Sequence, residues 1–281
     1  MRTSTTTILP FLLLLFALPT QGQPKGLNPE KPISQYILSI WDKNDGLPSQ
    51  SLTNIMQSSD KYLWISSYNG LYRFDGQRFK TYWKGGQGLL LTNSFSTVIE
   101  RKDGTLFVGT GGSGLLTQHQ DSFNIFGGAS PRLTSPISSF HFRDKNRLWV
   151  GVRGEGLYAF QEDTFWMHQE EPLLRKVTIS AIAEDKEGRL YFATEGNGVV
   201  ILSPDGSYSY INEQQGLLDP ITTSFCHDSK GRMWIGTAEG LNYVDSEGNL
   251  NSIPEIESYY VNKVREDVYG SIWVGTTNGL F

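Results

Sequence analysis

The residue types that most often carry enzymatic chemistry are sparse in this sequence. The single cysteine, Cys226, cannot form a disulfide within the chain or build a thiolate zinc site. It follows Phe225 in an alternating apolar run, where a free cysteine usually acts as a small buried hydrophobe. The histidines fit no HExxH or other metal-ligand pattern. They are His119, His141, His168 and His227. We therefore assign no catalytic residue, no metal site and no cofactor.

Two glycine-containing stretches also lack the spacing of known ligand loops. Residues 42–46 (DKNDG) begin like a calcium loop, but the ligand spacing is off by one and no Glu stands at the twelfth position. Residues 111–114 (GGSG) are not followed by the lysine that a phosphate-binding loop requires. Both stretches are better explained as turns.

Composition favours many short strands. The chain has 281 residues with 24 basic and 29 acidic side chains, a net charge of −5 and no basic block, which argues against nucleic-acid binding. Thirty glycines and 12% aromatic residues suit strands joined by tight turns. No long stretch has apolar residues at the helical spacing i, i+3, i+4, i+7.

An internal repeat organises the chain. A phrase centred on an aromatic residue recurs about every 42 residues, which is the period of a β-propeller blade. The aromatic residues are Trp64, Phe107, Trp149, Tyr191, Trp234 and Trp273. An Asp stands four to six positions before each aromatic residue, and a Gly-Leu or Gly-Val pair follows it. We expect the recurring aromatic residues to pack between neighbouring blades rather than to bind sugars.

One period contains four strand-like pieces. In the first repeat they span residues 51–57, 62–67, 71–75 and 78–83. Gly supplies positive φ at the turns, and Asp closes the hairpin between the first two strands. The sequence therefore predicts an all-β fold: a β-propeller with about six four-stranded blades, the last one incomplete.

The N-terminus has the pattern of an export signal. Arg2 precedes an apolar run from Ile8 to Leu18, and small residues follow up to Gly22. We assign residues 1–22 to a secretory signal peptide, 23–35 to a linker and 36–281 to the propeller repeats. A retained N-terminal anchor is the alternative. The apolar run is short for a bilayer, and no other segment is apolar for long enough to cross one.

The repeat resembles that of a known family. The stretches DGLPS (residues 45–49), SLTNI (51–55), LWI (63–65) and NGLYRFDG (69–76) resemble the two-component regulator propeller repeat. Its Gly-Leu start recurs at residues 88–89 and 216–217. The resemblance covers roughly residues 36 to 281.

The resemblance implies a receptor. In that family the propeller is the periplasmic sensor of an inner-membrane receptor, followed by more blades, an immunoglobulin-like domain, a membrane helix and an output module, often a histidine kinase. Many such sensors are linked to polysaccharide use. The chain ends at Phe281 inside the third strand of the sixth repeat, so we expect an N-terminal fragment of a longer receptor. A truncated gene is the alternative, and self-association into a homodimer is open.

The expected ligand site lies on one rim of the propeller. The loops between the second and third strands open on the same face as the loops that lead into the first strands, and this face forms a shared concave site. Its polar loop residues are the candidates for binding a small molecule or glycan. They are Tyr68, Asn69, Arg153, Glu155, Glu195, Asn197, Glu239 and Asn278. The alternative is that they are ordinary turn residues.

Two other functional classes stay open. A secreted propeller enzyme is one of them. A sialidase would need an arginine cluster at the funnel, where Arg153 is the only clear arginine, and a streptogramin-type lyase would need a histidine and acidic metal ligands near the axis. An interaction scaffold with a protein ligand is the other class.

Overall fold

The computed structural model describes residues 35, 41–47, 49, 51–85, 90, 92–119, 122–126, 133–143, 147–161 and 164–281. The predicted signal peptide and nearly all of the predicted linker lie outside these residues. Within them, no helix is both long and apolar enough to cross a bilayer. Short 3-10 helices lie at Pro172–Leu174 (η2), Glu213–Gln215 (η3) and Pro254–Ile256 (η4).

The strands form six antiparallel sheets, each made of strands consecutive in sequence. Blade 1 comprises β1 (Leu52–Gln57), β2 (Leu63–Ser67), β3 (Gly70–Phe74) and β4 (Phe79–Tyr82). Blade 2 comprises β5 (Phe95–Glu100), β6 (Leu106–Thr110), β7 (Leu115–His119) and β8 (Ser122–Ile125). Blade 3 comprises β9 (Ile137–Phe142), β10 (Arg147–Val152), β11 (Gly156–Gln161) and β12 (Thr164–Met167).

The remaining blades repeat this order. Blade 4 comprises β13 (Ile179–Glu184), β14 (Leu190–Thr194), β15 (Val199–Leu202) and β16 (Tyr208–Ile211). Blade 5 comprises β17 (Thr222–His227), β18 (Met233–Thr237), β19 (Gly240–Val244) and β20 (Leu250–Ser252). Blade 6 comprises β21 (Val261–Glu266), β22 (Ile272–Thr276) and β23 (Gly279–Leu280).

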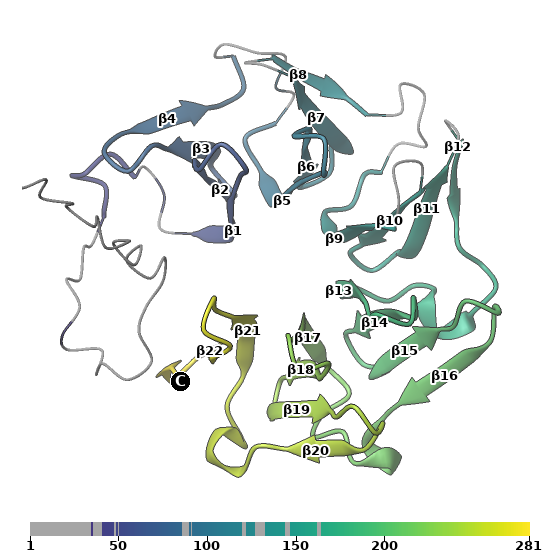
Figure 1. The fold of residues 1–281 in the computed structure, drawn as a ribbon. Helices are drawn as coiled ribbons and strands as arrows, with labels where there is room; N and C mark the ends of the chain where they lie inside the picture. Colours follow the sequence, from purple (N-terminus) through teal and green to yellow (C-terminus); the bar gives the residue numbers. More distant parts are fainter. Residues whose placement is uncertain are drawn as a thin grey trace, which may run out of the picture.

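The blades surround a central axis in chain order (Figure 1), with the first strand of each blade innermost. This confirms the predicted six-bladed β-propeller with an incomplete last blade. The strand bounds predicted for the first repeat agree with the structure to within one residue at each end. Blades 1 and 6 are the two ends of the arc, and β21 does not pack on β1 as the other inner strands pack on one another.

The recurring aromatic residue fills the space between adjacent blades, as predicted. Trp64 of blade 1 packs with Phe95, Val98 and Leu106 of blade 2. Trp149 packs in the same way on blade 4, and Trp234 on blade 6. Blades 2 to 5 therefore bury both of their apolar faces against two neighbours, whereas blades 1 and 6 each have one neighbouring blade.

Glycines on the second strand let neighbouring blades approach closely. A Cβ at Gly151 of blade 3 would lie 2.7 Å from the Ile179 carbonyl oxygen of blade 4. Equivalent positions in blades 2 and 5, Gly109 and Gly236, are just as crowded. Blade 6 has the same glycine, Gly275, but the nearest atom to its Cβ would be 3.8 Å away. This difference follows from the open end of the arc.

We expect Gly151→Ala to destabilise the propeller by about 1–3 kcal/mol, because the added methyl group forces blades 3 and 4 apart. Gly275→Ala is the matched control, with the same substitution at the same blade position and no neighbour to displace. Urea unfolding of both variants measures the effect. Equal losses for the two variants would show that the close approach of the blades is not the cause.

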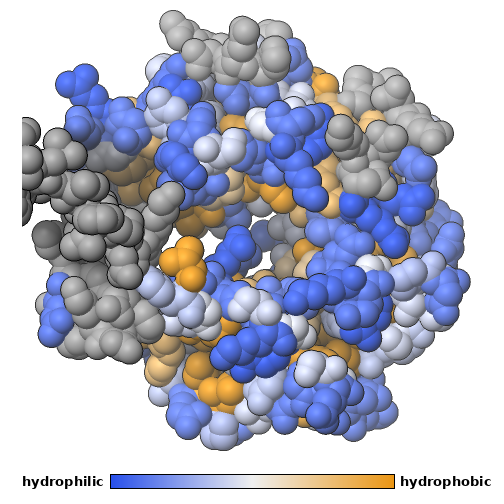
Figure 2. Space-filling model, in the orientation of Figure 1, coloured by the Kyte–Doolittle hydropathy of each residue, from blue (hydrophilic) through white to orange (hydrophobic). Residues whose placement is uncertain are grey.

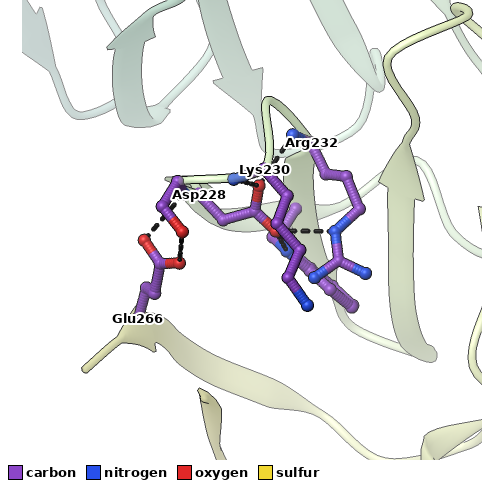
Figure 3. A network of polar contacts seen from close by, with 6 residues as sticks. Asp228, Lys230, Arg232 and Glu266 are labelled. Atoms are coloured by element: carbon purple, nitrogen blue, oxygen red, sulfur yellow. Dashed lines mark hydrogen bonds and ion pairs between the residues drawn. The ribbon is translucent and has the colours of Figure 1, made fainter. Parts of the chain in front are cut away.

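A buried aspartate, Asp228, stabilises the β17–β18 turn of blade 5. The Asp228 carboxylate accepts hydrogen bonds from the Trp234 indole N–H at 2.8 Å and from the Arg232 guanidinium at 2.6 Å (Figure 3). It also accepts the backbone N–H groups of Lys230 and Arg232, which closes the β17–β18 turn. Burial opposes ionisation of Asp228, but the hydrogen bonds from Trp234 and Arg232 outweigh it and lower the pKa of this carboxyl.

Stability should therefore depend on the charge of Asp228. Since its pKa is lower in the folded chain, the stabilisation is fully present above its usual pKa of 3.8 and is lost as the pH falls below that value. At neutral pH, Asp228→Asn should cost about 2 kcal/mol of unfolding free energy. The difference between wild type and variant should shrink in acid.

The measurement is chemical unfolding of the wild type and the variant across this pH range. Asp245→Asn, in an exposed turn of the same blade, is the control and should cost less. A difference between wild type and Asp228→Asn that does not change with pH would contradict the prediction.

Candidate ligand-binding site

Each innermost strand carries a β-bulge at the same position. In β1, Leu52 pairs with Ser67 and Asn54 pairs with Ser66, so Thr53 is left out of the register. The same irregularity occurs in the other five blades. The bulged residues are all small and polar: Thr53, Ser96, Ser138, Ser180, Thr223 and Asn262.

These bulged residues line a cavity on the propeller axis. The cavity has a volume of about 390 Å³, and all six bulged residues contribute to its wall. Figure 2 shows the central hollow, with hydrophilic residues around much of it. The ring of side chains that carry one amide and five hydroxyl groups, one from each blade, therefore lines a single cavity.

The hydroxyl groups of this ring are not equally available. Thr53 donates to the Phe95 carbonyl at 2.8 Å, and Ser138 donates to the Ile179 carbonyl at 2.8 Å. Thr223 donates to the carbonyl of Val261 in the same way. In these three blades the hydroxyl proton links one blade to the next. In contrast, the buried Ser180 Oγ has no hydrogen-bond partner among the described residues.

Three of the predicted site residues also line the cavity. Tyr68, Arg153 and Glu195 come from the β2–β3, β10–β11 and β14–β15 loops of blades 1, 3 and 4. None of their side chains has a hydrogen-bond or ion-pair partner among the residues that the structure describes. The backbone holds two of these residues in place, because Arg153 N–H donates to the Pro136 carbonyl and Glu195 N–H donates to the Thr178 carbonyl.

The other five predicted residues lie outside the cavity wall, in the turns of the same rim. In four of them the backbone N–H donates to a Ser or Thr hydroxyl oxygen, and this bond closes the loop after the second strand. These four are Asn69, Asn197, Glu239 and Asn278. The same hydroxyl donates to the carbonyl of the glycine at or just before the start of the third strand, as Thr194 does to Gly198 at 2.8 Å. Glu155 accepts a hydrogen bond from Tyr158 at 2.8 Å. Turn formation thus accounts for these positions, and their contact with a ligand stays a prediction.

Tyr260 and Asn262 of blade 6 complete the polar wall. Burial raises the pKa of the Tyr260 phenol, and the negative charge of Glu195 raises it further. Tyr260 is therefore a neutral O–H donor at physiological pH. With Arg153 and Ser180 as donors and Glu195 as an acceptor, the cavity can bind a ligand that both donates and accepts hydrogen bonds.

None of the described residues that line this cavity is a histidine. His141 lies 3.1 Å from Glu184, across the interface of blades 3 and 4, and His168 is buried against Tyr208 at 2.6 Å. Burial lowers the pKa of His168. Among the described residues, no group of three or more His, Cys, Asp or Glu side chains has the arrangement of a metal site.

Sequence reasoning missed the ring of bulged residues. The aligned first strands do carry a signal, because the second residue of each is Thr, Ser or Asn. Simple in–out alternation along a strand does not show that this residue faces the axis, since a bulge shifts the alternation by one.

The fold is a β-propeller with a polar cavity on its axis. The sequence profile described as "Two component regulator propeller" matches residues 174–196 and 216–239. These two stretches of the chain thus match the repeat of the two-component regulator propeller family. No curated protein matches the sequence.

Solved structures of the same fold include extracellular domains of receptors from B. thetaiotaomicron. The domain of hybrid two component system BT3049 has a TM-score of 0.73 at 20% identity and covers 86% of this chain and 34% of that one. The domain of one component system BT4673 has a TM-score of 0.71 at 22% identity and covers 84% and 32%. The chain therefore spans about a third of the length of these domains.

A lyase has the same fold. A catalytically inactive variant of virginiamycin B lyase from Staphylococcus aureus, determined with quinupristin, has a TM-score of 0.62 at 14% identity. It is covered over 80% of its length, and 83% of this chain is covered.

The bonding pattern of the ring predicts which hydroxyl groups stabilise the fold. Thr53→Val keeps the side-chain shape but leaves the Phe95 carbonyl without its donor, which should cost about 1 kcal/mol of unfolding free energy. Ser180→Ala removes a hydroxyl without a partner, so the melting temperature should be unchanged or slightly higher. Calorimetry measures the melting temperature and the unfolding free energy of both variants. A larger loss for Ser180→Ala than for Thr53→Val would be inconsistent with the assigned bonds.

Proposed function

We propose that this propeller is the extracytoplasmic sensor module of a two-component-type receptor, and that it binds a small hydroxyl-rich ligand such as a sugar in the axial cavity. The observation that carries the proposal is the convergence of unpartnered polar groups on one cavity: Ser180, Arg153, Glu195 and Tyr68. The family of the repeats and the extracellular receptor domains of the same fold support it.

The chemistry of the cavity favours a neutral hydroxylated ligand. A sugar hydroxyl accepts a hydrogen bond from Ser180 or Arg153 and donates one to Glu195. Tyr68 is about half exposed at the cavity and presents an aromatic surface for an apolar sugar face. One such ligand would therefore supply hydrogen-bond partners for both the donors and the acceptor of the cavity.

Signalling requires more than binding. A ligand shifts a conformational equilibrium only by its differential affinity for the two states. The cavity wall includes residues from every blade, so a bound ligand contacts the whole arc at once. The ligand would therefore stabilise one arrangement of the blades relative to a following domain.

The lyase of the same fold suggests a second function, that of a propeller enzyme. As expected from the sequence, such chemistry would need a histidine and acidic metal ligands near the axis. The described wall of the cavity contains one carboxylate, from Glu195, and no histidine. This composition favours binding without turnover.

The test is a thermal-shift screen of the chain with neutral mono- and oligosaccharides. A ligand at a hundred times its Kd should stabilise the fold by about 2.7 kcal/mol. Ser180→Ala and Glu195→Gln should each weaken binding about tenfold or more without lowering the melting temperature of the free protein.

Glu239→Gln is the matched control, since Glu239 lies on the same rim but outside the cavity wall, and it should bind as the wild type does. Binding that is indifferent to both cavity variants would place the ligand elsewhere. Conversion of the bound compound to product would favour the enzyme.

A further inference from the structure

The β1–β2 turn of blade 1 and the β17–β18 turn of blade 5 have the same backbone. In blade 1, Ser58 N–H donates to the Tyr62 carbonyl and Lys61 N–H donates to the Ser58 carbonyl. In blade 5, Asp228 and Gly231 make the corresponding two bonds. Lys61 even adopts the positive φ of 75° that Gly231 has at 82°. Ser58 therefore occupies the place of Asp228.

The aromatic and cationic groups around the two turns also correspond. In blade 5 the Arg232 guanidinium lies 4.7 Å from the Trp234 ring and 5.6 Å from the Tyr243 ring. In blade 1 the Arg73 guanidinium lies 5.9 Å from the Trp64 ring and 4.5 Å from the Tyr62 ring. The arginine and the tyrosine have exchanged strands, but each blade keeps a Trp, a Tyr and an Arg together.

The carboxylate that joins these groups in blade 5 has no counterpart in blade 1. Asp228 accepts hydrogen bonds from both the indole of Trp234 and Arg232 (Figure 3). The shorter Ser58 instead donates to Asp60 or to the Tyr62 carbonyl. In the described part of the chain the Trp64 Nε1–H has no hydrogen-bond partner, although Trp64 is only 2% exposed. Such an orphan donor is rare in a folded protein.

A pocket lies at this position. It has a volume of about 400 Å³ and opens between blades 1 and 2. Its polar wall includes Ser58, Asp60, Trp64, Arg73, Glu100 and Asp103. Because the β1–β2 turn is at the opposite end of β1 from the bulged Thr53, this rim pocket lies on the far side of the propeller from the axial cavity.

The charges of the rim pocket select the ligand. Glu100 accepts the backbone N–H and the hydroxyl of Ser59 at 2.7 and 2.8 Å, and Asp103 is paired with Arg101 at 2.7 Å. Arg73 has no carboxylate partner among the described residues. Three carboxylates against Arg73 and Arg101 disfavour an anion. A simple cation cannot accept the Trp64 N–H. A neutral hydroxylated ligand carries no negative charge, and its hydroxyl groups can accept the hydrogen bond of Trp64 and donate one to Asp60.

We propose that the rim pocket between blades 1 and 2 is a second binding site, specific for a neutral hydroxylated ligand. One ligand oxygen takes the place that the Asp228 carboxylate fills in blade 5, and it accepts the hydrogen bond of Trp64 Nε1–H. A neighbouring hydroxyl of the ligand donates to Asp60. This site is separate from the axial cavity and does not depend on the function proposed for it.

Nitrogen-15 NMR of the tryptophan indole groups provides the test. Trp64→Phe identifies the Trp64 resonance in the spectrum of the whole chain. Titration with D-glucose and with glycerol should shift the Trp64 signal. The Trp234 and Trp273 signals should stay in place, because Asp228 and Asp267 already accept their N–H groups at 2.8 Å.

A designed substitution tests whether the ligand accepts the Trp64 N–H. Ser58→Asp rebuilds the arrangement of blade 5, so its carboxylate should take the Trp64 N–H and weaken binding of both probes about tenfold or more. Asp60→Asn is the second variant, and it should weaken binding while the turn keeps its shape. Glu195→Gln, in the axial cavity, should leave the Trp64 titration unchanged.

Several results would overturn the proposal. They are the absence of any Trp64 shift with glucose or glycerol, a shift with sodium acetate alone, and equal shifts of Trp64, Trp234 and Trp273. Unchanged affinity in both Ser58→Asp and Asp60→Asn would also overturn it. A Trp64 response that persists in Glu195→Gln would support it even if no ligand binds the axial cavity.

Discussion

The burial of apolar surface between adjacent blades is the interaction on which the rest of this structure depends. A single four-stranded sheet has two apolar faces and can hide neither alone. In the described chain, Phe95 and Val98 of blade 2 are 0% and 3% exposed because Trp64 of blade 1 covers them. Their equivalents in blade 1, Leu52 and Ile55, are 45% and 59% exposed at the open end of the arc. The contrast shows that the neighbouring blade, and not the sheet itself, shields the side chains of the inner strand from solvent.

The bulge on each inner strand connects this packing to the candidate site. An uninterrupted strand would turn alternate residues toward the two neighbouring blades. The extra residue leaves the ladder, so its side chain can face the axis while the residues on either side stay in the interfaces. Three of the bulged hydroxyl groups link neighbouring blades, and Ser180 does not. The bulged position therefore contributes both to contacts between blades and to the wall of the cavity. A bulged hydroxyl joins two blades where a carbonyl of the next blade lies within hydrogen-bond distance.

The fold could be predicted from the sequence because its determinants are local and repeated. The aromatic residue, the turn Gly and the Gly-Leu pair recur in each period, and the structure confirms the strands that they delimit. The candidate site was harder to predict. Tyr68, Arg153 and Glu195 were found because the loop after the second strand has a known direction. Asn197 and Glu239 resemble them in sequence, but their turns are closed by Thr194 and Thr237 away from the cavity. The Trp64 pocket depends on a comparison of hydrogen bonds between blades, which spacing alone cannot provide.

The composition of the axial ring has a consequence for how such a protein can change over generations. Among the codons for serine, threonine and asparagine, AGU, ACU and AAU differ from one another only at the second base, and so do AGC, ACC and AAC. A single nucleotide change at Ser180 or Thr223 can therefore exchange a hydroxyl for an amide, or add a methyl group, without placing a large or charged group on the axis. Since the bulge is set by the backbone and flanked by residues buried between blades, such exchanges change the polar groups on the cavity wall while the repeat itself is preserved. One scaffold can thus vary the chemistry of its axis through small genetic steps.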